Sequence, residues 1–326
     1  MTVTVLRVTR RSCRVRLLRA EDEPAAVRFL ETHRDSALIM LSNLAKAGLG
    51  GGTTSYQGAY AAHLHGRDIS ALAAHYGNGW LLLQAPEGAA PLAALALSAS
   101  GRPLTSLLGS SEQVAAVRRE LGLHDCLCSL DSNEDVMALA LPDLILPAAI
   151  GNSEFRVRLA RSSELELLAN WRLAFVEEAL RVKDSPALRA RVRDEIAGWQ
   201  AEKANFVLAC RGRLVASCAV IADYGETLQV AAVWTPAALR GRGFARCLIA
   251  GVMARARDRG TQRALLITSN PAARRAYRAV GFQKVGQQSL VQFVEPLRLR
   301  LPRPKASSLA RRLPQDTALA NSRGAA

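Results

Sequence analysis

The sequence predicts an α/β protein in which a mixed, mostly antiparallel sheet is flanked by helices, in two tandem halves. Apolar, β-branched runs typical of strands alternate with segments whose apolar residues recur at helical spacing. The length of 326 residues suits about two domains. Residues 142–153 contain two prolines and a Gly-Asn pair and are predicted to be a linker. We therefore expect one domain over residues 14–148 and a second over residues 154–296.

The composition is that of a globular chain whose excess charge lies at the two ends. Hydrophobic residues make up 49% of the sequence, and the mean hydropathy is +0.06. The chain lacks a membrane-spanning apolar run and a signal-peptide core, which predicts a cytoplasmic protein without membrane partners. Of the net charge of +15, residues 1–19 carry +6 and residues 297–326 another +6, which leaves +3 between them. We predict a basic leader (1–13) and a basic flexible tail (297–326), and nucleic acid is disfavoured as a partner.

Neither the cysteines nor the histidines have the spacing of a metal site. Cys126 and Cys128 are predicted on one face of a strand, where thiols more often serve as packing groups. His63, His65 and His75 fall in a predicted meander at positions of equal parity, so they share one face. No acidic or thiol ligand accompanies them at a convincing spacing, and packing is preferred over metal binding.

The first half is predicted to contain both strands and helices. The predicted strands cover residues 14–19, 56–64, 69–76, 80–84, 104–108 and 136–141. The predicted helices cover residues 23–32, 37–47, 90–98 and 112–121. Glycine-containing turns join the three strands between residues 56 and 84, which predicts an antiparallel meander.

The second half repeats this pattern. The predicted strands cover residues 155–159, 205–211, 214–222, 227–234 and 264–268, and a further strand ends the domain. The predicted helices cover residues 163–180, 187–201 and 244–259, and another follows Asn270-Pro271. No residue-level repeat between the two halves is identified, so their relation rests on element order.

A glycine-rich turn joins the strand at residues 228–234 to the helix that starts at Phe244. The turn reads Arg240-Gly241-Arg242-Gly243, and glycines let the backbone turn tightly while the first free N–H groups of the helix point into the same space. Such a turn suits an anionic phosphate. It has neither the Gly-Lys-Ser/Thr of a Walker A loop nor the three glycines of a dinucleotide fingerprint.

This segment resembles the acyl-CoA-binding motif of the GNAT superfamily of N-acyltransferases, Arg/Gln-x-x-Gly-x-Gly/Ala. Arg240, Gly243 and Ala245 occupy the motif positions. Thr235-Pro236 precede them, and Asn270-Pro271 and Tyr277-x-x-x-Gly281-Phe282 follow in the order seen in the family. Residues 155–294 therefore resemble a bacterial GNAT N-acetyltransferase of uncharacterised substrate, and the first half resembles a degenerate GNAT-like domain.

The resemblance implies acetyl-CoA as cosubstrate and no metal. Main-chain N–H groups of the turn would bind the pyrophosphate, and backbone exposed where two central strands splay apart would hold the pantetheine arm. The implied cofactor-binding residues are Val233, Thr235, Arg240, Gly241, Arg242, Gly243, Phe244, Ala245 and Asn270.

The resemblance also implies direct attack of an amine on the thioester. Tyr277 is the implied general acid that protonates the leaving thiolate. Many members of the family place a glutamate base on the central strand, and residues 229–234 contain none. Glu226, at the start of that strand, is the nearest candidate, and Glu177, Glu178 or a backbone-bound water chain are alternatives.

The expected function is transfer of an acetyl group from acetyl-CoA to a primary amine of a small molecule or peptide. The missing strand glutamate keeps open an alternative, a non-catalytic CoA-binding or regulatory protein. The identity of the acceptor, the acyl-chain preference and the oligomeric state, a homodimer included, stay open.

Overall fold

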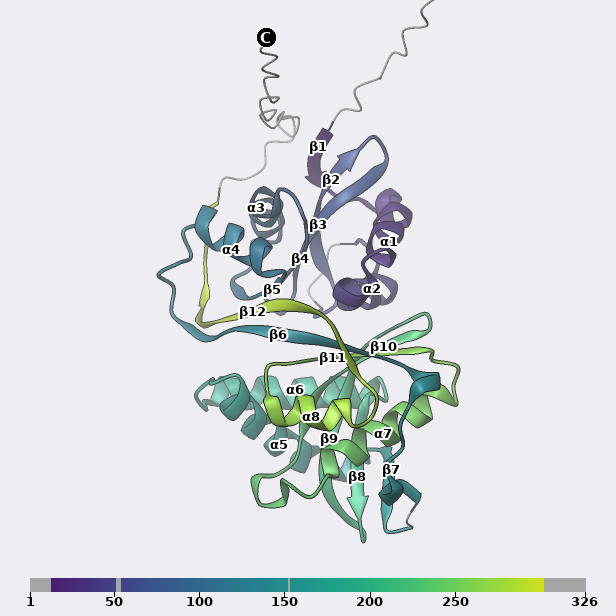
Figure 1. Cartoon of the computed structure of the whole chain (residues 1–326). Helices are drawn as coiled ribbons and strands as arrows, with labels where there is room; N and C mark the ends of the chain where they lie inside the picture. The colour runs from purple at the N-terminus through teal and green to yellow at the C-terminus, as the bar shows by residue number, and fades with distance from the viewer. Residues whose placement is uncertain (1–12, 51–53, 152, 302–326) are drawn as a thin grey trace, which may run out of the picture.

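The computed structural model describes residues 13–50, 54–151 and 153–301 and shows one order of elements twice. Each half runs strand, two helices, three strands, helix, strand, helix, strand (Figure 1). The first half contains β1 (Cys13–Leu17), α1 (Glu23–Glu31), α2 (Arg34–Ala47), β2 (Gly58–His65), β3 (Asp68–Tyr76), β4 (Trp80–Gln84), α3 (Ala89–Ser100), β5 (Leu104–Gly109), α4 (Ser111–Glu120) and β6 (Cys128–Ala140). The second contains β7 (Phe155–Leu159), α5 (Leu165–Ala179), α6 (Pro186–Ala201), β8 (Asn205–Cys210), β9 (Arg213–Tyr224), β10 (Thr227–Trp234), α7 (Phe244–Arg257), β11 (Arg263–Thr268), α8 (Pro271–Arg278) and β12 (Gln283–Leu297).

The two halves share one sheet because they exchange their last strands. The sheet has 12 strands in the order β1-β2-β3-β4-β5-β12-β6-β11-β10-β9-β8-β7. β12, from the second half, pairs with β5 of the first, and β6, from the first half, pairs with β11 of the second. Both strands cross the middle of the molecule between the two halves (Figure 1). The predicted tandem halves are therefore interlocked and do not merely pack against each other.

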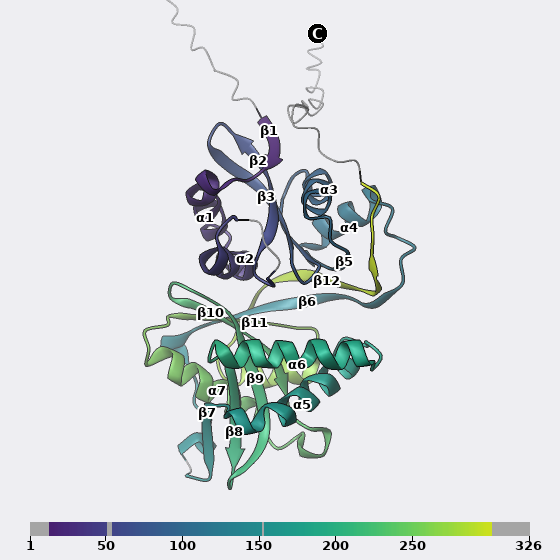
Figure 2. The same cartoon turned by 180° about the vertical axis from the view of Figure 1, so that it is seen from behind.

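Helices cover both faces of the sheet in each half. In the second half α5 and α6 lie on one face, and α7 and α8 lie on the other (Figures 1 and 2). The apolar side of α7 packs on the strands in the largest buried cluster, together with Leu228, Val230, Leu266 and Tyr277. Burial of an apolar helix stripe on a sheet is the main source of stability for such layers. The predicted mixed, mostly antiparallel α/β architecture is confirmed.

A short residue-level repeat links the two halves, contrary to the sequence analysis. Arg14-Val15-Arg16-Leu17 of β1 and Arg156-Val157-Arg158-Leu159 of β7 have the same letters. Arg16 forms two hydrogen bonds to Asp22, and Arg158 forms two to Glu164, in each case six residues later. Each arginine also donates to the carbonyl of the next residue, Leu17 or Leu159. The match covers four consecutive letters and, two residues later, Arg19 and Arg161, and it is too short to stand out from the sequence without its contacts.

Several predicted boundaries shift in the structure. β6 begins at Cys128, eight residues before the predicted start at residue 136, because it pairs with β12 as well as β11. β12 runs to Leu297, and Leu299 and Leu301 are half-buried against the cluster of the first half, so the predicted flexible tail starts too early. Residues 1–12 and 302–326, with most of both basic ends, lie outside the described residues. Within the described part of the chain, no helix is long and apolar enough to cross a membrane.

Candidate functional site

The glycine-rich turn between β10 and α7 adopts the conformation that its glycines permit. Gly241 and Gly243 have φ angles of 78° and 79°, in the left-handed region where residues with a Cβ are strained. Gly243 is the N-cap of α7. A Cβ added to Gly241 would meet no atom within 4 Å, and one added to Gly243 would meet only the Arg246 guanidinium at 3.6 Å. The outer side of the turn is therefore open.

Six consecutive backbone N–H groups of this turn, residues 241–246, have no protein acceptor among the described residues. The first intrahelical bond is donated by the N–H of Cys247 to the carbonyl of Gly243. A helix N-terminus with free N–H groups carries a partial positive charge and binds anions, phosphates above all. The predicted pyrophosphate-binding residues Gly241, Arg242, Gly243, Phe244 and Ala245 all lie in this run.

Next to the turn, β10 leaves its parallel neighbour β11. The two strands pair only from Thr227 to Val230, so the last four residues of β10 have no partner on that side. On the other side, Ala232 and Val233 stand opposite Cys218 alone, which is a β-bulge, and Ala232 has a φ of 51°. The splay was predicted near Val233 and Thr235, and the structure places it there. The buried hydroxyl of Thr235 has no hydrogen-bond partner in the described chain, the kind of unmet group that a ligand can satisfy.

Arg240 is held by protein groups. Its guanidinium donates two hydrogen bonds to Glu178 of α5, at 2.8 and 2.9 Å, and its Nε donates to the carbonyl of Thr235 at 3.0 Å. It also lies over the ring of Trp234, 4.7 Å from the centroid. Arg240 thus ties the turn to α5, and Glu178, considered above as a base, is its partner. The pair is 62 residues apart in sequence, and no local pattern predicts it.

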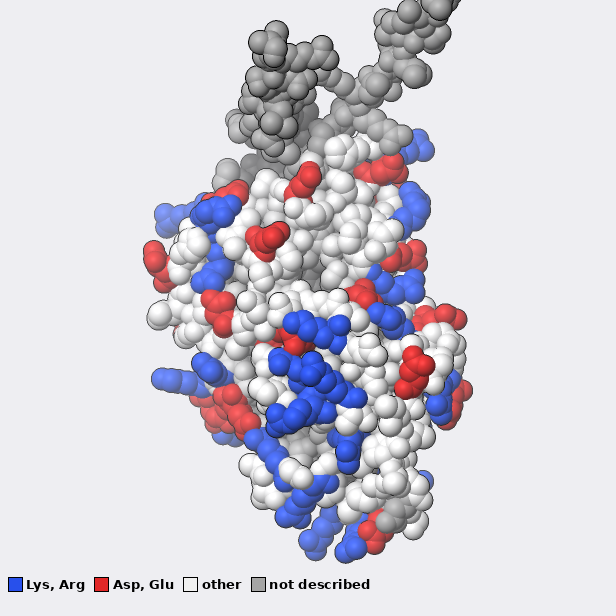
Figure 3. Space-filling model, in the orientation of Figure 1, with Lys and Arg blue, Asp and Glu red and all other residues white. Residues whose placement is uncertain are grey.

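Basic side chains gather on the face formed by α7 and α8. Figure 3 shows a dense group of arginine and lysine side chains over these helices. Residues 240–284 contain eleven arginines and lysines and one acidic residue, Asp258. Arg242, Arg246, Arg275 and Arg278 are exposed. Because exposed like charges raise the local positive potential, this face favours a polyanionic ligand.

Tyr277 lies on α8, in the buried cluster beneath the turn, and is 5% exposed. Burial raises the pKa of its phenol well above the ordinary value, and the nearby Cys218 thiol raises it further. Cys218 is the residue opposite the bulge, and Tyr277 and Cys218 belong to the same buried cluster. The phenol of Tyr277 is therefore protonated at neutral pH, as that of an ordinary tyrosine is, and carries a proton that it can donate.

Asn270 and Glu226 are at different ends of the sheet. Asn270 caps α8, because its side-chain oxygen accepts from the N–H groups of Ala272 and Ala273 at 2.8 and 3.2 Å. Glu226 lies in the exposed turn before β10, at the opposite end of that strand from the glycine-rich turn. Eight strand residues separate the two ends, or roughly 26 Å at about 3.3 Å per residue. The structure does not bring Glu226 to Tyr277.

A narrow cavity of about 10 Å³ opens on the face of α5 and α6, next to the bulge. Aromatic side chains form much of its wall, namely Phe175, Trp199 and Trp234. Ala232 and Cys218 contribute the bulge side of the wall. Such a volume holds about one water molecule. The cavity therefore reaches the splayed strands from the face opposite the glycine-rich turn.

Comparisons with known proteins agree with this geometry. Residues 169–282 match a family model described as the acetyltransferase (GNAT) family. No curated protein matches the chain. A structure of a Drosophila protein superposes with a TM-score of 0.60 at 12% identity, covering 86% of this chain and 98% of that one. A GCN5-related N-acetyltransferase from Sphaerobacter thermophilus superposes with a TM-score of 0.54 at 17% identity, covering 87% and 96%.

The two superpositions span both halves, and at these identities they are evidence of fold. The match of residues 169–282 covers the bulge of β10, the glycine-rich turn, α7, β11 and Tyr277. The second half of this chain therefore carries a domain of the GNAT acetyltransferase family.

Proposed function

We propose that this protein is an acetyl-CoA-dependent N-acetyltransferase that acts on a primary amine. One arrangement carries the proposal: the six free N–H groups of residues 241–246 lie beside the unpaired edge of β10, and Tyr277 belongs to the buried cluster that contains Cys218, opposite the bulge. The first group suits a pyrophosphate, the second suits the amides of a pantetheine arm, and the third suits a leaving thiolate. No other strand-to-helix turn of the described chain combines these features.

Charge supports a CoA ester as the ligand. CoA carries a pyrophosphate and a third phosphate, and the basic face over α7 and α8 would surround them. Arg242 and Arg246 are exposed beside the turn and would form charge-assisted hydrogen bonds to phosphate. Arg240 would act indirectly, because Glu178 already accepts from its guanidinium. We assign it the role of holding the turn in place.

The proposed chemistry follows from the position of Tyr277 in the buried cluster that also contains Cys218, opposite the bulge of β10. A neutral amine attacks the thioester carbonyl, the C–N bond forms and the C–S bond breaks. The departing thiolate then takes the phenolic proton, and the phenolate is reprotonated by the nitrogen of the intermediate. A side chain that stays protonated until a thiolate is expelled is suited to this role.

The test is calorimetric titration of the purified full-length protein with CoA and acetyl-CoA, followed by an amine panel in which thiol release is measured. We expect one CoA per chain and thiol release with at least one amine. Absence of CoA binding would rule out the proposal. Tight CoA binding with no thiol release from any amine would instead favour the non-catalytic alternative.

A further inference from the structure

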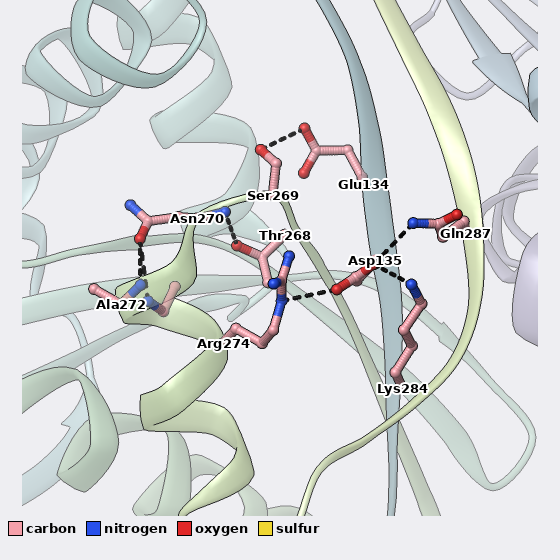
Figure 4. Close-up of polar contacts among 10 residues, drawn as sticks. Glu134, Asp135, Thr268, Ser269, Asn270, Ala272, Arg274, Lys284 and Gln287 are labelled. Atoms are coloured by element: carbon pink, nitrogen blue, oxygen red, sulfur yellow. Dashed lines mark hydrogen bonds and ion pairs between the residues drawn. The ribbon is translucent and has the colours of Figure 1, made fainter.

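Glu134, on the exchanged strand β6, is a buried carboxylate for which the fold gives no reason. It is 7% exposed, and one of its oxygens accepts a hydrogen bond from the hydroxyl of Ser132 at 2.6 Å. The same oxygen accepts one from the hydroxyl of Ser269 at 2.9 Å (Figure 4). No cation of the described residues forms an ion pair with it. Burial of a carboxylate without a cation is costly, so such groups are found preferentially where they serve a function.

Its neighbour Asp135 shows what a structural carboxylate looks like on the same strand. Asp135 is 5% exposed and lies 2.7 Å from both Arg274 of α8 and Lys284 of β12, and Gln287 donates to it at 3.2 Å. The hydrogen bond from Lys284 is the main reason that the pKa of Asp135 is lowered. In Figure 4 both cations contact Asp135, and neither contacts Glu134. Asp135 thus links α8 and β12 to β6 through ion pairs, whereas Glu134 forms no ion pair with any described residue.

Glu134 lies at the end of β11 where the sheet opens. Thr268, the last residue of β11, pairs with Asp135, so Ser269 and Glu134 come next. β10 has already left β11 by this point, after Val230. If the proposed function holds, the thioester would lie along the unpaired edge of β10, next to this end of β11.

The direction of the side chain also suits an acceptor. Successive strand residues face opposite sides, so Glu134 faces away from α8, on the side of Ala138 and Leu265, which pack with Leu38 of α2. That face is opposite the glycine-rich turn and α7. Ser269 is exposed, so the carboxylate has a solvent-accessible neighbour. An amine approaching from this face would meet Glu134 without crossing the phosphate site.

We propose that Glu134, supplied by the first half, receives the acceptor amine and is its general base. The inference rests on the proposed acetyl transfer. The carboxylate binds the ammonium and takes one proton, the nitrogen lone pair forms the C–N bond, and the C–S bond breaks as the thiolate takes the proton of Tyr277. The second nitrogen proton returns to Tyr277, the third stays on the amide, and Glu134 releases its proton to solvent. The second half alone therefore lacks the base.

The test compares Glu134→Gln with Asp135→Asn in the full-length protein. Both changes replace a buried carboxylate by its amide on adjacent residues, but only the first is on the acceptor side. CoA affinity is measured first by calorimetry. The CoA complexes are then titrated with ethylamine, butylamine and tyramine, and thiol release from acetyl-CoA is followed with the amine that binds best.

We expect Glu134→Gln to bind CoA within about twofold of wild type, to lose at least about tenfold in amine affinity, and to fall about 10²- to 10⁴-fold in kcat. Asp135→Asn should lower thermal stability and leave amine affinity unchanged. Equal amine affinity in wild type and Glu134→Gln would overturn the assignment, and so would wild-type protein that binds none of the three amines. If CoA itself does not bind, the proposed function fails. The amines are then titrated into the CoA-free wild type and Glu134→Gln, and equal amine affinities, or no amine binding by wild type, would overturn the assignment of Glu134.

Discussion

The two halves have the same order of elements but different turns at the same place. α3 and α7 both start after a left-handed glycine, Gly88 with a φ of 67° and Gly243 with a φ of 79°. Four residues separate β4 from α3, and nine separate β10 from α7. Pro86 and Pro91 near Gly88 have no N–H, and Glu87 adds a negative charge. The turn of the first half therefore offers fewer free N–H donors than the glycine-rich turn, and its acidic residue disfavours a phosphate.

The two halves also differ in whether the strands next to this turn stay paired. In the first half a Cβ on Gly109 of β5 would lie 2.8 Å from the Cβ of Leu83 on β4, so these strands stay close. In the second half β10 and β11 separate after Val230. One fold thus yields a candidate ligand site only where a long glycine-rich turn and separated strands occur together. The first half would contribute by supplying β6.

The largest expected effect concerns Tyr277. Tyr277 is the seventh residue after Asn270, the N-cap of α8. The equivalent position of α4, seven residues after its N-cap Ser110, is Val117, so the first half has an aliphatic side chain there. Tyr277→Phe deletes only the hydroxyl, and kcat for the best amine should fall about 10²- to 10⁴-fold while CoA affinity is retained, because the lost interaction acts in the transition state.

Tyr60→Phe is the matched control for Tyr277→Phe. Tyr60 is buried in the first half, and its hydroxyl lies 3.0 Å from that of Tyr76. The control should cost stability and leave kcat unchanged. A wild-type kcat in Tyr277→Phe, with chemistry rate-limiting, would remove the general-acid role.

The second-largest expected effect is on CoA affinity, and it comes from substituting Gly243 but not Gly88. Gly243→Asp places a carboxylate where the pyrophosphate would bind and should weaken CoA binding by roughly 100-fold, or about 2.7 kcal/mol. Gly88→Asp adds the same side chain at a similar φ, so both variants carry similar backbone strain. Calorimetry should show weakened binding in the first variant only. A comparable loss in both would mean that strain, and not the phosphate site, is responsible.

A smaller effect concerns acid stability, because all five histidines of the sequence lie in the first half. His75 is fully buried, and this burial lowers its pKa to about 4. In the unfolded chain the pKa of this histidine is about 6.5, so between pH 6.5 and 4 the unfolded state binds more protons than the folded state. The contribution of His75 to the free energy of unfolding is therefore complete above about pH 6.5 and decreases as the pH falls toward 4. Acidification from pH 7 to pH 5 should lower the free energy of unfolding by about 2 kcal/mol through His75.

Urea unfolding of wild type and His75→Gln at pH 7 and 5 measures the contribution of His75. The variant should be less stable at pH 7 and less sensitive to acid. An equal loss of stability on acidification in both proteins would assign the acid sensitivity to other groups.

Much of the fold was predictable because its signals are local. Periodicity located nearly all helices and strands, and Trp80–Gln84 and Phe155–Leu159 have the predicted bounds. The glycine-rich turn and the cap at Asn270 were equally local. The exchange of β6 and β12 was not, because it depends on pairing between segments about 150 residues apart, such as Ser289 with Asn133. For the same reason the sequence pointed to Glu226 as a base and missed Glu134, whose environment exists only after β6 has crossed into the other half.

The smallest expected effect concerns the ion pair between Arg240 and Glu178, which has no counterpart at the β4–α3 turn among the described residues of the first half. It tests whether Arg240 binds phosphate or holds the turn. Arg240 and Glu178 are both exposed, and exposed pairs contribute about 0.2 to 1 kcal/mol. If Arg240 positions the turn, Arg240→Ala and Glu178→Ala should each weaken CoA binding by about two- to fivefold, and the double variant should be no weaker than either single variant. If Arg240 instead binds phosphate directly, Glu178→Ala would free its guanidinium and tighten CoA binding. The direction of the change in Glu178→Ala, measured by calorimetry at fixed ionic strength, therefore decides between the two roles, because the two mechanisms predict opposite signs.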